Sequence, residues 1–87
     1  MSETQHRDLV QAAQLILEEA VRAASLHPPF NSAHEGKAVI EEEFDELWTE
    51  IKAKEKDHVA ILNEAVQLGA MAVRFVADVG LRPQVAK

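Results

Sequence analysis

The sequence predicts an all-α protein, a three-helix protomer in which antiparallel second and third helices complete a helical bundle by oligomerisation. Apolar residues recur at helical spacing in three segments, and no segment alternates apolar and polar residues for long. Capping residues and prolines separate these segments. The 87-residue length leaves room for one domain, residues 1–87.

The first helix is predicted over about Glu3–Leu26. Ser2 and Gln5 have the spacing of a capping box, in which side chains satisfy the free N–H groups of the first helical turn. Pro28 and Pro29 end the helix, because proline has no backbone donor and restricts the residue before it. The apolar positions at helical spacing are Leu9, Ala13, Ile16, Ala20 and Ala24.

The second helix is predicted from a cap at Ser32 to about Lys54. It follows the linker 27–31, and Ser32 with Glu35 forms a second capping box. Phe30 in the linker is expected to pack as a hydrophobic staple on this helix, with stacking on a nucleobase as the alternative. The predicted apolar stripe is Ile40, Phe44, Leu47 and Ile51, flanked by Val39 and Trp48.

The third helix is predicted from an N-cap at Asp57 to about Val79, with Gly80 as its C′ residue and Pro83 beyond. It is apolar nearly all round, and two other helices cannot surround such a helix. Gly69 suggests a close helix–helix approach of the kind found at a subunit interface. We therefore expect a homodimer or homotetramer.

Composition excludes several function classes. The formal net charge of −6 argues against a nucleic-acid partner, which needs a basic surface. The chain has no cysteine and no N-terminal signal-peptide pattern, so a cytoplasmic location is expected. No apolar run is read as long enough to span a membrane. The sequence thus predicts neither nucleic acid nor membrane as a partner.

Glutamates are concentrated in the second helix. At about 100° per residue, Glu43 and Glu46 lie on neighbouring turns beside the apolar stripe, with Glu50 between them. Glu41 and Asp45 point elsewhere, towards solvent. Like charges beside a core repel one another and lose hydration, and a divalent cation relieves both costs. The alternative is an ordinary solvated acidic face.

Glu64 in the third helix projects from a largely apolar face, and Gln67 is one turn further along. A carboxylate in such surroundings needs a cation, a metal ion or a proton. Antiparallel packing of the two helices can bring Glu43, Glu46 and Glu64 together. The alternative is a salt bridge from Glu64 to Arg74 or Arg22.

These residues resemble the signature of the MazG-like all-α NTP pyrophosphohydrolases, which have E-E-x-x-E on one helix and E-x-x-D on the next. Residues 42–46, Glu-Glu-Phe-Asp-Glu, fit the first motif completely. Residues 64–67, Glu-Ala-Val-Gln, fit the second except at the last position. The resemblance covers the second and third helices, about half of the chain.

The resemblance implies a Mg²⁺-dependent enzyme, with Mn²⁺ as a possible substitute, that hydrolyses a nucleoside triphosphate to the monophosphate and pyrophosphate. It implies that Glu43, Glu46 and Glu64 bind the metal and that Glu42 acts as a further ligand or orients the attacking water. Arg74 is the expected phosphate contact.

Gln67 is the departure from the motif, because glutamine brings an oxygen but no negative charge. A working enzyme with a modified site and a degenerate relative with a weakened metal site are both consistent with it. A non-catalytic helical interaction module is the remaining alternative.

Overall fold

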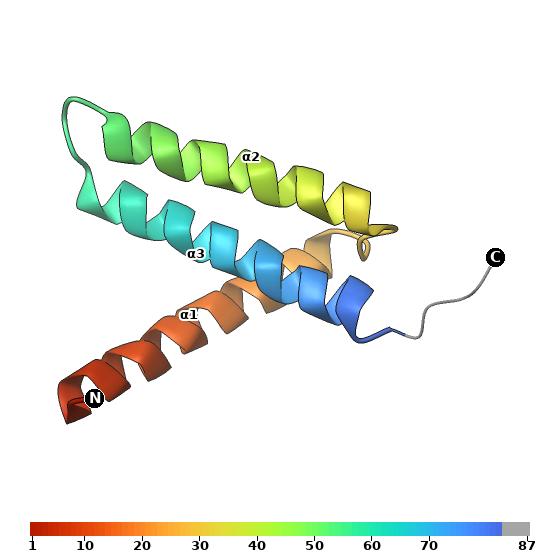
Figure 1. The fold of residues 1–87 in the computed structure, drawn as a ribbon, viewed down its shortest axis with the longest axis horizontal. Coiled ribbons are helices and arrows are strands. Elements are labelled where there is room, and N and C mark those ends of the chain that lie inside the picture. The colour runs from red at the N-terminus through yellow and green to blue at the C-terminus, as the bar shows by residue number, and fades with distance from the viewer. Residues whose placement is uncertain (83–87) are drawn as a thin grey trace.

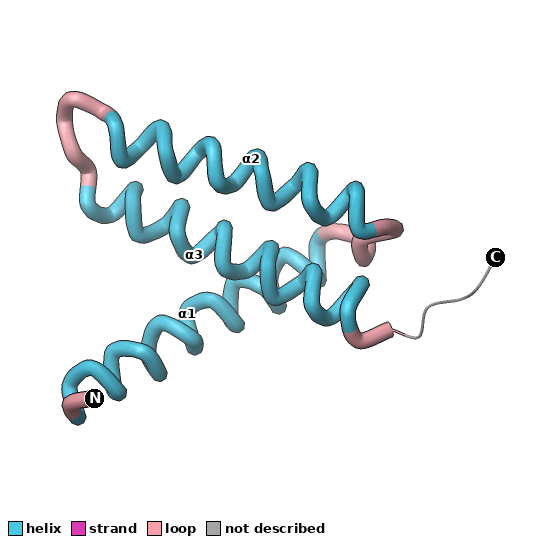
Figure 2. Tube along the Cα trace, viewed as in Figure 1, coloured by secondary structure: helices cyan, strands magenta, loops and turns pink. Residues whose placement is uncertain are grey.

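The computed structural model describes residues 1–82, which form helices and no strand. The elements are α1 (Glu3–Leu26), α2 (Ala33–Lys52), α3 (His58–Phe75) and the π-helical segment η1 (Val76–Gly80) that continues α3. Figures 1 and 2 show α1, α2 and α3 and the two loops that connect them. The predicted all-α class is confirmed.

Local capping explains where the helices begin. The side chains of Ser2 and Ser32 accept hydrogen bonds of 3.1 Å from the backbone N–H groups of Gln5 and Glu35. Asp57 accepts from Ala60 N at 3.1 Å in the same way. All three predicted N-caps are therefore confirmed, and α1 has the predicted bounds. α2 ends at Lys52, two residues before its predicted end.

α3 is the central helix, because it packs against both α1 and α2. α2 and α3 lie side by side, joined at one end by the loop 53–57 (Figure 1). At the other end the linker 27–32 lies beside the end of α3 (Figure 2). α1 crosses α3 closely at Gly69, where an added Cβ would lie 2.8 Å from Ile16 Cδ1. The expected close approach at Gly69 is thus made to α1 of the same chain, not to another subunit.

The buried core is small and lies where the three helices meet the linker. It consists of Ala20, Ala23, Phe30, Ala70 and Met71. The prediction that Phe44 belongs to the buried stripe of the second helix is wrong, since Phe44 is 58% exposed. It lies on a face of α2 that neither α1 nor α3 covers. Val59 and Leu62 of α3 are also exposed, so the apolar third helix is not enclosed within one protomer.

The end of the third helix differs from the prediction. The α-helical pattern stops at Phe75, and a wider π-helical turn continues to Gly80. The Leu81 N–H donates to the Val76 carbonyl at 2.8 Å. No described residue has a positive φ, so Gly80 does not form the left-handed C′ turn expected of it. Pro83, the predicted stop, lies outside the described residues.

The stretch His58–Gly80 is long and apolar enough to cross a membrane, judged by length and composition. This corrects the sequence reading that no run has the necessary length. The stretch contains Glu64 and Arg74, which interrupt its apolar pattern. Its mean hydropathy of 1.4 nevertheless remains high enough for a membrane span. Core helices of soluble proteins pass the same test, so the observation does not assign a location.

Candidate metal centre

Three glutamates from two helices meet between α2 and α3. Glu43 and Glu46 are one turn apart on α2, and Glu64 faces them from α3. One carboxylate oxygen from each side chain lies within 4.8 Å of the others. We call these residues the acidic cluster. Its assembly depends on the packing of α2 on α3, because the helices place distant segments of the chain side by side (Figure 1).

The acidic cluster contains negative charge without a compensating partner. Glu43 and Glu64 are half-buried, and one oxygen of each, Oε2, is buried without a hydrogen-bond partner. Loss of hydration and then repulsion from Glu46 and Glu64 raise the pKa of Glu43 to about 7. Loss of hydration, followed by repulsion from Glu46 and Glu50, also raises the pKa of Glu64. Without a cation, the fold favours protonated carboxyl groups at this place.

The expected alternative partners of Glu64 lie elsewhere. Arg22 forms an ion pair of 2.6 Å with Glu19 on its own helix. Arg74 donates to the Pro28 carbonyl at 3.1 Å. The ion pairs Arg22–Glu19 and Lys37–Glu41 do not include Glu64. Converging carboxylate oxygens with no protein cation are a donor set suited to a hard divalent ion.

The glutamates around the acidic cluster differ in position. Glu50 is half-buried and close enough to Glu64 to affect its pKa. Glu42 is exposed and is the weakest of the charges that raise the pKa of Glu43. Glu41 pairs with Lys37, and Asp45 is exposed. The structure therefore leaves Glu41 and Asp45 outside the cluster, as the helical spacing predicted.

Gln67, one turn after Glu64, is half-buried and faces α1 as well as the site. The pKa of Glu19 is lowered chiefly by Arg22 and also by a hydrogen bond with Gln67. Glu19, a carboxylate of α1 whose side chain is only 14% exposed, is not among the residues predicted from the sequence. Its position next to Ala20, a buried alanine of α1, is the sequence feature that could have indicated a partly buried carboxylate.

Arg74 is buried beneath the linker and is only 6% exposed. Its Nη2 donates to the Pro28 carbonyl, and its guanidinium lies 4.5 Å from the centroid of the Phe30 ring. Asp78 in η1 accepts a hydrogen bond of 3.0 Å from the Phe30 N–H. We call Phe30, Arg74 and Asp78 the linker clamp. Neither long-range contact has a local signal in the sequence, so Arg74 was expected to contact phosphate and Asp78 had no expected role.

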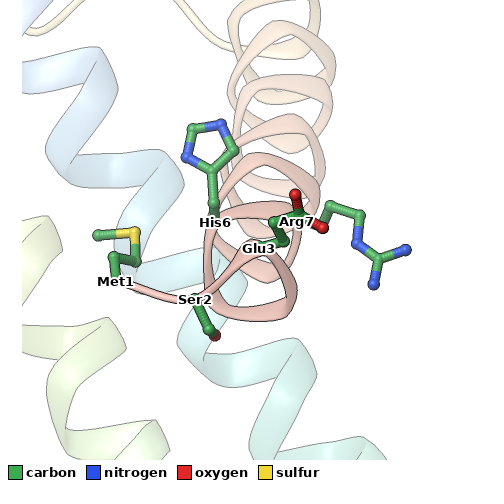
Figure 3. A pocket seen from close by; sticks show the side chains of 5 residues that line it. All are labelled: Met1, Ser2, Glu3, His6 and Arg7. Carbon is green, nitrogen blue, oxygen red and sulfur yellow. The ribbon is translucent and has the colours of Figure 1, made fainter.

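A hollow of about 530 Å³ lies at the start of α1 and is lined by Met1, Ser2, Glu3, His6 and Arg7. Figure 3 shows that these side chains project in different directions around the first helical turn and do not converge. This hollow is distant in sequence from the acidic cluster, and all five residues that line it come from the first seven residues of the chain.

The second hollow, about 360 Å³, lies between α1, the linker and the α2–α3 pair. We call it the linker cavity. Its lining includes Glu43 of the acidic cluster, Arg74 of the linker clamp, and Gln67. The linker cavity therefore connects the acidic cluster with a buried arginine, so a ligand held at the carboxylates could extend into it.

Comparison with known proteins gives no match: no family model fits the sequence, and neither a curated protein nor a solved structure is significantly similar to it.

Proposed function

We propose that the chain is a Mg²⁺-dependent nucleoside triphosphate pyrophosphohydrolase, a relative of the MazG-like enzymes. The observation that supports this most is the acidic cluster, with three carboxylate oxygens within 4.8 Å of one another. Two of its buried oxygens have no partner in the protein. These oxygens fit a hard cation, because a divalent ion accepts carboxylate ligands and offsets their repulsion.

In this proposal Glu43, Glu46 and Glu64 hold the metal ion. Mg²⁺, when bound, supplies charge neutralisation for the triphosphate and positions a water for attack. Glu42 is exposed beside Glu43 and either adds a ligand or orients that water. Gln67 contributes a neutral amide oxygen, which weakens the metal site relative to an aspartate at the same position.

The same proposal includes a homo-oligomer, a dimer or a tetramer, in which antiparallel α2 and α3 form part of a larger bundle in the cytoplasm. The exposed apolar side chains of all three helices support it; they include Leu17 and Val21 of α1, Phe44 and Trp48 of α2, and Val59 of α3. The chain exposes 6725 Å², whereas a compact monomer of 9.6 kDa exposes about 5,000 Å². Covering these faces would extend a small core.

Release of pyrophosphate from a panel of ribo- and deoxyribonucleoside triphosphates, with Mg²⁺ or Mn²⁺, tests the proposal. We expect release with at least one nucleotide and none in the presence of excess EDTA. The metal ion should also raise the melting temperature. Absence of release throughout the panel, together with an unchanged melting temperature, would refute the proposal.

The second candidate is a non-catalytic helical interaction module, including a degenerate relative of these enzymes. The specific observation in its favour is the same set of exposed apolar side chains, which a partner protein could cover. Under this candidate, the Glu43→Gln/Glu46→Gln double variant is at least as stable as the wild type whether or not Mg²⁺ is added. Under the enzyme proposal, only the wild type gains stability with Mg²⁺.

A further inference from the structure

The linker cavity contains a buried cation that the fold does not fully use. Arginine has five N–H donors. Nη2 of Arg74 donates to the Pro28 carbonyl, and Nη1 contacts only the weak acceptor Met71 Sδ at 3.5 Å. Nε is buried and has no partner. Arg74 is 6% exposed and lines the cavity, so the N–H groups that its terminal nitrogens leave unpaired can donate to a ligand there.

The other lining residues restrict the chemistry of that acceptor. Two carboxylates, Glu35 and Glu43, line the same cavity, and the fourth titratable group is His27. A phosphate or carboxylate group beside Arg74 would be repelled by both glutamates. A neutral carbonyl oxygen can accept from Arg74 without that repulsion. The cavity therefore favours an uncharged, oxygen-bearing group at its arginine.

The walls and size of the cavity indicate the rest of the ligand. Ala23, Val39 and Met71 give apolar surface, and about 360 Å³ is within the usual range of small-molecule pockets. Phe30 already stacks against the guanidinium, which holds the donor in a fixed orientation. Glu43 connects this space to the acidic cluster. A flat ring with an exocyclic oxygen, attached to a metal-binding group, matches these features.

We propose that Arg74 is a specificity residue that selects oxo-bearing nucleobases, such as hypoxanthine, guanine or uracil, over adenine in the linker cavity. The inference rests on the proposed nucleotide substrate and changes the role of Arg74 from phosphate contact to base contact. At position 6, hypoxanthine and guanine present an acceptor oxygen, whereas adenine presents an amino donor. A donor facing the guanidinium leaves its N–H groups without an acceptor and adds repulsion.

Inosine and adenosine provide the test, because their bases differ chiefly at position 6. Each nucleoside is titrated into the full chain without metal or phosphate, and amide NMR shifts are followed. We expect inosine to bind about tenfold more tightly than adenosine, with shifts at linker-cavity residues. Equal affinities, tighter binding of adenosine, or no binding of either at millimolar concentration would overturn the proposal.

Variants of the linker cavity test which residues cause the preference for inosine over adenosine. Arg74→Lys retains the charge but lacks Nε and the planar fork, so the preference for inosine should disappear. Because Arg74 also holds the linker, Val39→Phe is a second variant, which fills the cavity and leaves the clamp intact. Ala38→Phe is its control, being the exposed neighbour on α2 that does not line the cavity. An unchanged preference in Val39→Phe would count against the proposal.

These measurements separate the two proposals. If inosine is preferred but no pyrophosphate is released from any nucleotide, only the proposed reaction fails. If pyrophosphate is released equally well from ITP and ATP, the reaction stands and the role of Arg74 fails.

Discussion

The acidic cluster and the linker clamp both connect α3 to earlier parts of the chain, yet their charged groups have opposite surroundings. In the clamp, Asp78 accepts from the Phe30 backbone at 3.0 Å and Arg74 donates to the Pro28 carbonyl at 3.1 Å. In the acidic cluster, like charges face one another and two buried oxygens have no partner. The clamp stabilises the fold, whereas the cluster destabilises it until a proton or cation is bound.

This difference indicates where function lies. A small core of five residues gives little stability to spare, so a destabilising arrangement needs a reason. Binding of a ligand to the folded state recovers the lost stability. Changes to the clamp should therefore lower stability, and changes to the cluster should lower activity while raising the stability of the metal-free protein.

Loss of the clamp's aromatic ring should have the largest effect. Phe30 is 4% exposed, so Phe30→Ala should lower the free energy of unfolding by about 3 kcal/mol, measured by urea denaturation. Leu81→Ala is the control, since Leu81 is 76% exposed, lies outside the three helices and should lose less than about 1 kcal/mol. Equal losses in the two variants would show that the clamp is not a major source of stability.

Removal of one charge from the acidic cluster should lower the rate of pyrophosphate release. Glu46→Gln should reduce pyrophosphate release at least about 100-fold, which corresponds to about 2.7 kcal/mol in the barrier. Glu41→Gln should change the rate less than about twofold, because Glu41 pairs with Lys37 outside the cluster. A Glu46→Gln variant with wild-type activity would exclude the cluster as the metal site.

The raised pKa of Glu43 predicts a dependence of stability on pH. Between its ordinary value of 4.5 and about 7, the folded protein keeps a proton that the unfolded chain has lost. The metal-free protein should therefore lose stability as the pH rises through this window, by on the order of 1–2 kcal/mol after allowance for solvent screening. Below pH 4.5 both states are protonated and this contribution is constant.

Urea denaturation at pH 5 and pH 8 in EDTA measures this loss. Glu43→Gln should reduce the difference between the two pH values and leave the part that comes from Glu64, and Glu41→Gln should leave the difference unchanged. Saturating Mg²⁺ should also reduce the difference, because the cation binds the ionised carboxylates. A wild-type stability that is equal or greater at pH 8 would contradict the prediction.

Gln67→Asp should have the smallest effect. The new carboxylate, one turn after Glu64, should tighten Mg²⁺ binding about tenfold, or about 1.4 kcal/mol, as measured by calorimetry. It should also lower metal-free stability slightly, because Glu19 interacts with this position. Gln14→Asp, at an exposed position of α1, is the control and should leave the affinity for Mg²⁺ unchanged. Weaker Mg²⁺ binding in Gln67→Asp would show that this position does not face the metal.

The features that the sequence predicted well depend on neighbouring residues. Ser2, Ser32 and Asp57 cap helices by bonds to residues three positions away, so their roles can be read directly from the sequence. The pairing of Glu43 with Glu46 likewise follows from helical periodicity. The meeting of both with Glu64 was anticipated, but only under an assumption about how the second and third helices pack.

The features that were missed are not determined by the spacing of residues along one helix. Phe44 fits an apolar helical stripe, yet no element of the protomer covers it. Gly80 has the sequence context of a helix stop, yet a π-helical turn continues through it. Asp78 accepts from a residue 48 positions earlier, and no periodicity indicates such a pair.

The sequence alone therefore determined the helices, their caps and the row of glutamates on α2, because each of these depends on interactions within one or two helical turns. Only the tertiary structure decided that Glu64 completes the acidic cluster, that Arg74 and Asp78 hold the linker, and that a cavity joins these two places. Such arrangements depend on how α3 packs against α1 and α2, and that packing involves residues far apart along the chain.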